Sequence, residues 1–123
     1  MFDVALAREI LSQIYGATQT IQQRFQRIKS PLDFTGSDEG MEKLDAICMQ
    51  LIAIGESVKN LDKVTDGALL PNYPEIEWKR VMGLRDILSH HYFDNDAEIV
   101  YDVCVGHFPE LAECVHRMLD ELR

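Results

Sequence analysis

One apolar stripe near the start of the chain constrains the fold more than any other feature of the sequence. Its members alternate in steps of four and three residues, the spacing of one face of an α-helix: Ala7, Leu11, Ile14, Thr18, Ile21, Phe25 and Ile28. The pattern predicts a long helix from about Asp3 to Lys29. Ser30 and Pro31 end it, because the residue before a proline avoids helical geometry. A stripe of this length is typical of a helix packed against an antiparallel partner.

A second long helix is predicted to begin near Ser37. Asp38 and Glu39 follow it, where their carboxylates complement the positive end of a helix dipole. The apolar positions from Met41 to Leu61 form a stripe broad enough to indicate burial on more than one side.

The rest of the chain also has helical periodicity. A third helix is predicted to start at Pro74, which suits a first helical turn, and to run into a pair of histidines. A short helix is predicted at about 96–105, with a capping box formed by Asn95 and Glu98, and a last helix opens at Pro109. No segment alternates with the period of a strand. The sequence therefore predicts an all-α fold, an up-and-down bundle of four main helices plus one short helix, in one domain covering residues 1–123.

The composition limits the cellular compartment in which we expect the protein. No apolar run approaches the ~20 residues needed to cross a bilayer, and an acid at position 3 argues against a signal peptide. The three cysteines, Cys48, Cys104 and Cys114, are an odd number without a CxxC pair, which is typical of buried reduced thiols. We therefore expect a cytoplasmic protein with no membrane partner.

The net charge of −9 limits the possible partners. A dimer would carry twice that charge, and such a field repels polyphosphate unless a local basic cleft overrides it. Acidity favours solubility and decides nothing about chemistry.

Metal and cofactor sites find little support in the sequence. Cys104 with His107, and Cys114 with His116, are the nearest approach to a metal-binding pattern, but they lack the usual zinc spacing. The chain contains no phosphate-binding P-loop, no GxGxxG and no nucleophile elbow. We therefore predict no metal and no cofactor.

The segment RDILSHHY, residues 85–92, concentrates chemistry-bearing side chains at the end of the predicted third helix. Arg85 and Tyr92 fall within about 60° of each other on a helix, but Arg85 and His90 project about 140° apart. On one straight helix, the side chains of Arg85 and His90 therefore do not both point to one small site. Three alternatives remain: the helix bends near His90, the long arginine side chain extends around the helix, or a second chain supplies the missing group. His91 falls on the predicted apolar side, with Leu84, Ile87 and Leu88.

These residues resemble a known family. Arg85, Asp86 and His90 match the R-polar-x-x-x-H motif of the HEPN superfamily, and Tyr92 extends it to the R-x4-H-x-Y signature of HepT-like toxins. The segments AIGESVKNL, YPEIEWKRVMGLRD, YFDND and FPEL are also similar to this family, so the resemblance covers most of the chain.

The resemblance implies a metal-independent endoribonuclease that dimerises through its helices, with arginine and histidine from both subunits in one interfacial cleft. His90 would be the acid or base and Arg85 the group that stabilises the phosphorane. Asp86 would orient one of them, and Glu56 would border the cleft in a supporting role. Such a dimer would also resolve the angular conflict, because residues that diverge on one helix can converge across a twofold axis.

The resemblance further implies a type II toxin–antitoxin system. Its antitoxin, an MNT-type minimal nucleotidyltransferase, would neutralise the toxin by transferring AMP from ATP to Tyr92. The RNA substrate would also meet Lys79 and Arg80, one to two turns before Arg85, as phosphate-binding groups.

Two other interpretations of RDILSHHY remain. In one, the cluster is the solvated end of an ordinary helix, where arginine and histidine complement the dipole. In the other, a catalytically weak or inactive HEPN-fold protein binds a nucleotidyltransferase, and the cluster serves nucleotide or protein binding.

Overall fold

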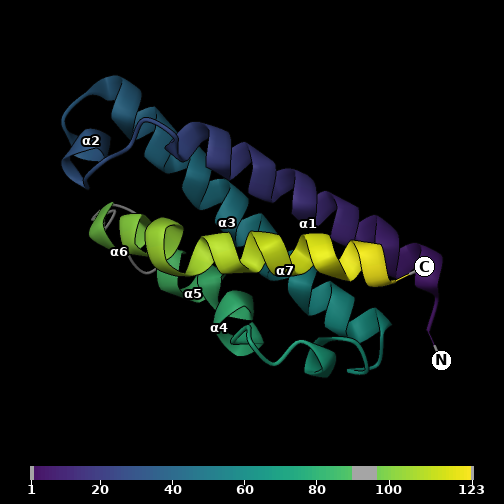
Figure 1. The fold of residues 1–123 in the computed structure, drawn as a ribbon. Helices are drawn as coiled ribbons and strands as arrows, with labels where there is room; N and C mark the ends of the chain where they lie inside the picture. Colours follow the sequence, from purple (N-terminus) through teal and green to yellow (C-terminus); the bar gives the residue numbers. More distant parts are fainter. Residues whose placement is uncertain (1, 90–96, 123) are drawn as a thin grey trace.

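The computed structural model describes residues 2–89 and 97–122 (Figure 1). These residues contain helices and no strand, so the predicted all-α fold is confirmed. The elements are α1 (Val4–Phe25), α2 (Leu32–Thr35), α3 (Asp38–Val64), the 3-10 helix η1 (Leu70–Asn72), α4 (Trp78–Met82), α5 (Leu84–Ser89), α6 (Ala97–Asp102), the π-helical segment η2 (Val103–His107) and α7 (Phe108–Glu121).

Helix α1 follows the predicted stripe closely. Asp3 caps it by accepting a hydrogen bond from the backbone N–H of Leu6 at 3.0 Å. The stripe residues are buried except Phe25, which is half-buried, and the Thr18 hydroxyl donates to the carbonyl oxygen of Tyr15 at 2.6 Å. The helix ends at Phe25, four residues before the predicted Lys29, although Ile28 beyond it is still buried.

Helix α2 was not predicted from the sequence. Its four residues are too few to show a period, and Phe34 is the residue it buries. A Cβ on Gly40 would lie 2.1 Å from the carbonyl oxygen of Asp33, so the backbone of α2 rests directly on the first turn of α3. Glycine at position 40 is what permits this approach.

Helix α3 is the centre of the bundle. It begins as predicted, with Ser37 accepting a hydrogen bond from the Gly40 N–H at 3.0 Å. Helices α1, α2, α4 and α5 all pack against it, and α7 packs against α1 (Figure 1). This surrounding explains the broad apolar stripe of α3, which buries Leu44, Ile47, Leu51, Ile54, Val58 and Leu61.

The predicted third helix is wrong in its start and its continuity. Pro74 lies in a loop, and the helical segment begins at Trp78. Trp78 Nε1 donates to the carbonyl oxygen of Tyr73 at 2.9 Å, and Tyr73 and Ile76 are buried, so the preceding residues fold as a turn packed on the core. Gly83 then separates α4 from α5, and its N–H is shared between the carbonyl oxygens of Lys79 and Arg80.

The last two predicted helices join through a π-helical segment. The predicted short helix at 96–105 begins at Ala97 and passes through η2 into α7 (Figure 1). The Phe108 N–H donates to the carbonyl oxygen of Val103, five residues back. Pro109 follows at once and has no N–H to continue the regular pattern. Asn95, the predicted cap residue, lies outside the described residues.

Long-range hydrogen bonds fasten the C-terminal end of α7 to two other parts of the bundle. Arg8 donates to the carbonyl oxygens of Leu119 and Leu122, which ties the start of α1 to the end of α7. The Tyr73 hydroxyl donates to Glu121 at 2.6 Å, which ties the loop before α4 to the same end of α7. No helix of the described chain has the length and apolarity to span a membrane.

Candidate active site

Helix α5 presents the arginine of the motif to solvent. Leu84 and Leu88 are buried on the side that packs against α3, while Arg85 and Asp86 are exposed. Ile87, expected on the apolar side, is 42% exposed, so it does not belong to the buried face of α5 that Leu84 and Leu88 form.

Gly55 sets how closely this segment approaches α3. A Cβ at Gly55 would lie 2.7 Å from the carbonyl oxygen of Val81 and 3.4 Å from Cβ of Leu84. The backbone of α3 therefore touches the end of α4 and the beginning of α5. The next residue along α3 is Glu56, so this contact brings its carboxylate within reach of α5.

Arg85 and Glu56 meet across this contact. Nη1 of Arg85 lies 3.4 Å from Oε1 of Glu56, although the two residues are 29 positions apart in the sequence. Nζ of Lys59 lies 3.6 Å from the same oxygen. The side chains of Arg85, Glu56 and Lys59 are 63%, 40% and 45% exposed, so a ligand in solution can reach all three.

The guanidinium of Arg85 is only partly engaged by this contact. One nitrogen faces Glu56, and a guanidinium carries five N–H donors in a planar fork. Among the described residues, the Glu56 carboxylate orients Arg85 through one nitrogen, and the other N–H groups of the fork have no acceptor there, so they suit an anionic group. That arrangement suits a transition state with charge on equatorial phosphate oxygens.

The remaining motif residues are placed only in part. Asp86 is exposed beside Arg85, whereas His90, His91 and Tyr92 lie outside the described residues. The predicted convergence of Arg85 with His90, the core-facing side of His91 and the role of Tyr92 therefore stay predictions.

Lys79 and Arg80, predicted to bind phosphate, lie on α4 and are exposed. Arg80 forms an ion pair of 3.4 Å with Glu77, three residues before it. An exposed pair of this kind is weak, so it leaves Arg80 able to turn toward another anion.

In the described part of the chain, no group of three or more His, Cys, Asp and Glu side chains is placed to hold one metal ion. Burial raises the pKa of the Cys104 thiol to about 12, with a contribution from Cys48, and burial raises that of Cys114 to about 11, with a contribution from Glu75. His116 instead faces Asp120, 3.6 Å away. Thiols that stay protonated are poor ligands.

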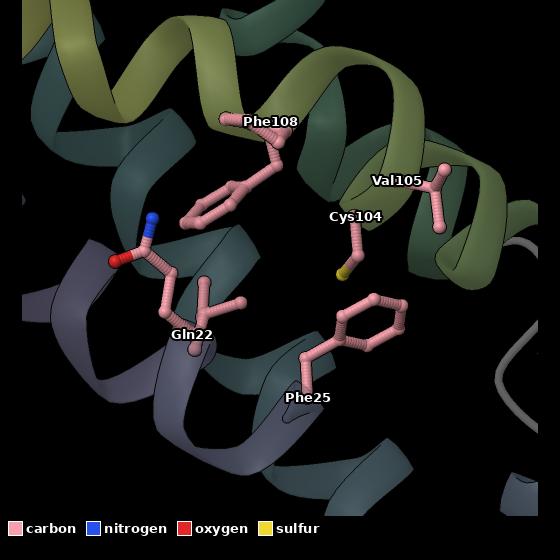
Figure 2. Close-up of a pocket in the computed structure, with 7 residues that line it drawn as sticks. Gln22, Phe25, Cys104, Val105 and Phe108 are labelled. Atoms are coloured by element: carbon pink, nitrogen blue, oxygen red, sulfur yellow. The ribbon is translucent and has the colours of Figure 1, made fainter. Parts of the chain in front are cut away.

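A pocket of about 300 Å³ lies between α1 and the η2–α7 segment (Figure 2). None of its lining residues comes from α5, the helix that carries Arg85. Its lining is mostly apolar: Ile21, Gln22, Phe25, Cys104, Val105, Phe108 and Pro109. Figure 2 shows the rings of Phe25 and Phe108 facing the space, with the Cys104 sulfur between them. A phosphodiester has no cation to meet here, so this pocket is not the candidate site.

Comparison with known proteins decides the family. The model of the family described as "Ribonuclease HepT-like" matches residues 17–118. A protein of Methanocaldococcus jannaschii named "Putative RNase MJ0127" is 30% identical over 105 residues, covering 79% of this chain and 82% of the relative. This chain belongs to the HepT-like ribonuclease family.

Other proteins whose names include "putative RNase" are also similar. "Putative RNase TTE0752" of Caldanaerobacter subterraneus is 33% identical over 76 residues, covering 62% of this chain and 64% of that relative. A two-part protein of Methanocaldococcus jannaschii, "Gamma-glutamylcyclotransferase and putative RNase MJ0434", is 32% identical over 78 residues, which are 33% of its length. No solved structure gives a significant match.

The family match contains Gly55, Glu56, Lys59 and Arg85. Sequence reasoning named Glu56 and Arg85 but missed Gly55 and Lys59. The spacing of Glu56 and Lys59, three residues apart on one helix, was the available signal for Lys59. The contact of Gly55 with α4 carries no local signal, because it depends on a segment about 26 residues further along the chain.

Proposed function

We propose that this HepT-like chain is a metal-independent endoribonuclease and the toxin of a type II toxin–antitoxin system. The observation that carries the proposal is the exposed Arg85, oriented by Glu56 within the segment matched by the ribonuclease family. In the reaction, a base removes the proton of a ribose 2′-OH, and that oxygen attacks the neighbouring phosphorus. The bond to the 5′-oxygen breaks, and an acid protonates that oxygen.

His90 supplies the proton transfers in this mechanism. A histidine side chain ordinarily titrates near pH ~6.5, so it can give or take a proton at neutral pH. Arg85 stabilises the charge of the phosphorane through guanidinium donors other than the one that faces Glu56, and Asp86 and Glu56 orient the two catalytic groups.

The test is cleavage of RNA by the purified chain in EDTA. We expect His90→Ala to lower kcat by about 10²–10⁴-fold and Arg85→Ala by about 10²–10³-fold, with helix content unchanged. His116→Ala is the matched control, since His116 is an exposed histidine on α7. Full activity in the His90 variant would refute the mechanism. A native chain that cleaves no RNA and is still bound by a nucleotidyltransferase would favour the inactive binding partner.

We also propose that the active form is a homodimer joined through the exposed face of α3 around Met49, with Glu56 at the border of the shared cleft. Met49 precedes Glu56 by seven residues, which places it within about 20° on the same helix face, and it is 73% exposed. A large apolar side chain at this exposure, on the same helix face as Glu56, suits an interface. Met49→Glu is expected to shift the chain from dimer to monomer in light scattering and to lower cleavage. The control is Leu32→Glu, a 75% exposed apolar residue on α2.

Neutralisation follows from modification of Tyr92 by an MNT-type nucleotidyltransferase. The phenolic oxygen attacks the α-phosphorus of ATP, pyrophosphate leaves, and the phenolic proton is released. On the predicted helix Tyr92 shares a stripe with Arg85, so an AMP group on it would bring a negative charge to the guanidinium and compete with RNA for it. Mass spectrometry after incubation with the enzyme and ATP should show added AMP in the native chain and in Tyr101→Phe, and none in Tyr92→Phe. Unchanged AMP addition in Tyr92→Phe would reject this site.

A further inference from the structure

Lys59 is a cation that the ribonuclease mechanism above leaves unused. It lies on α3, three residues after Glu56, and its Nζ contacts the same carboxylate oxygen as Arg85 Nη1. The two cations are therefore close neighbours, although they come from different helices. Two cations, Lys59 and Arg85, contact one carboxylate, that of Glu56. The summed charge of these three groups is positive, although the chain carries a net charge of −9.

The ion pairs within this cluster are too weak to stabilise the fold appreciably. All three side chains are between 40% and 63% exposed, and exposed ion pairs contribute little to stability. They are also readily exchanged for contacts with another anion. A structural role would call for burial or for bidentate geometry, and the single contacts of 3.4 and 3.6 Å provide neither.

The chemistry of Lys59 differs from that of Arg85. A lysine ammonium is a compact charge with three donors on a flexible stem, which suits an ordinary phosphate better than a planar transition state. In an acidic protein, affinity for RNA has to come from local groups of cations. A second cation beside the catalytic arginine is placed to bind the next phosphate of the strand.

We propose that Lys59 binds the RNA phosphodiester adjacent to the one held by Arg85, and that Glu56 holds the two cations side by side. This inference rests on the proposed ribonuclease function. It assigns Lys59 to substrate binding and gives it no part in the proton transfers.

The test compares Lys59→Gln with Lys63→Gln in the full chain. Lys63 is exposed one turn further along α3 and is not among the cations on Glu56 Oε1, so it controls for loss of general charge. Binding of a single-stranded RNA oligonucleotide is measured against salt in a His90→Ala background, which prevents cleavage. Lys59→Gln is expected to reduce the slope of log K against log salt by about 0.7 and to weaken binding about fivefold at ~0.1 M salt. Lys63→Gln is expected to change neither.

Cleavage kinetics separate binding from positioning. With His90 intact, Lys59→Gln should raise KM about fivefold and leave kcat within about twofold, while Lys59→Arg retains the native KM. A fall in kcat at unchanged KM, or equal effects of Lys59→Gln and Lys63→Gln, would overturn the proposal, as would a native chain that binds no RNA. If RNA binds and Lys59 shifts the salt slope but Arg85→Ala cleaves normally, the phosphate contact stands and the proposed catalytic mechanism falls.

Discussion

Glu56 has two cations on one carboxylate oxygen, and this gives it opposing effects on the proposed reaction. Its charge orients Arg85 but also reduces the positive field that an RNA strand meets. We expect Glu56→Gln to lower KM and to lower kcat by up to about 100-fold, because the arginine is no longer fixed. Steady-state cleavage kinetics measure both constants.

The control for this substitution is Glu39→Gln. Glu39 is also on α3 and also pairs with a lysine, Lys43, at 3.6 Å, but it lies near the start of the helix. It should leave kcat unchanged. Equal loss in the two variants would show that Glu56 has no specific role.

The cysteines give a second prediction at the residue scale. Burial raises the pKa of the Cys104 thiol from 9.0 to about 12, with a contribution from Cys48. Its thiolate fraction at pH 8 is therefore far smaller than that of an ordinary thiol, and the thiolate is the reactive form. We expect iodoacetamide to label Cys104 very slowly in the folded chain and at an ordinary rate after unfolding, as followed by mass spectrometry. Fast native labelling would mean that the pocket in Figure 2 opens to solvent around the sulfur.

At the scale of elements, the site depends on how closely α3 packs against the α4–α5 junction. Gly55→Ala places a methyl group 2.7 Å from the carbonyl oxygen of Val81. We expect a loss of about 1–3 kcal/mol in the free energy of unfolding, as for other overpacked contacts. The cleavage rate of the folded variant should also fall, because the methyl group pushes the α4–α5 junction away from α3 and so moves Arg85 away from Glu56.

Gly16 provides the matched variant. It lies inside α1, and a Cβ there would meet nothing within 4 Å. Gly16→Ala should raise the free energy of unfolding by about 0.5–1 kcal/mol through helix propensity alone. Urea unfolding measures both variants, and a stabilised Gly55→Ala would contradict the close contact.

For the molecule as a whole, the loop before α4 is tied to the end of α7 by the Tyr73–Glu121 hydrogen bond. Burial, together with this bond, raises the pKa of Tyr73 from 10.0 to about 12. The folded state therefore favours the protonated phenol. The resulting stability is fully present below pH ~10 and is lost as the pH rises toward about 12.

Tyr73→Phe tests this link. The native chain should lose more unfolding free energy between pH 10 and 12 than the variant, because both chains share every other group that titrates there. Urea unfolding at several pH values measures the difference. Parallel curves for the two chains would show that the phenol does not couple the loop to α7.

The sequence by itself determined the two long helices, α1 and α3, and their buried faces. A period of 3.6 residues is a local property, so the stripe of α1 and the stripe of α3 could be predicted without knowing what covers them. The caps at Asp3 and Ser37 are equally local. The motif around Arg85 was also visible, because its spacing lies within eight residues.

Only the tertiary structure decided how these helices are interrupted and which side chains meet. Packing against the core sets three irregular features that hydrophobic periodicity does not predict. These are the break at Gly83, the turn from Tyr73 to Trp78 and the π-helical segment before Pro109. The contact of Glu56 with Arg85 spans 29 residues of sequence and requires a glycine on α3 to face a carbonyl oxygen of α4. Such contacts depend on the distance between two backbones, and that distance is set by the whole core.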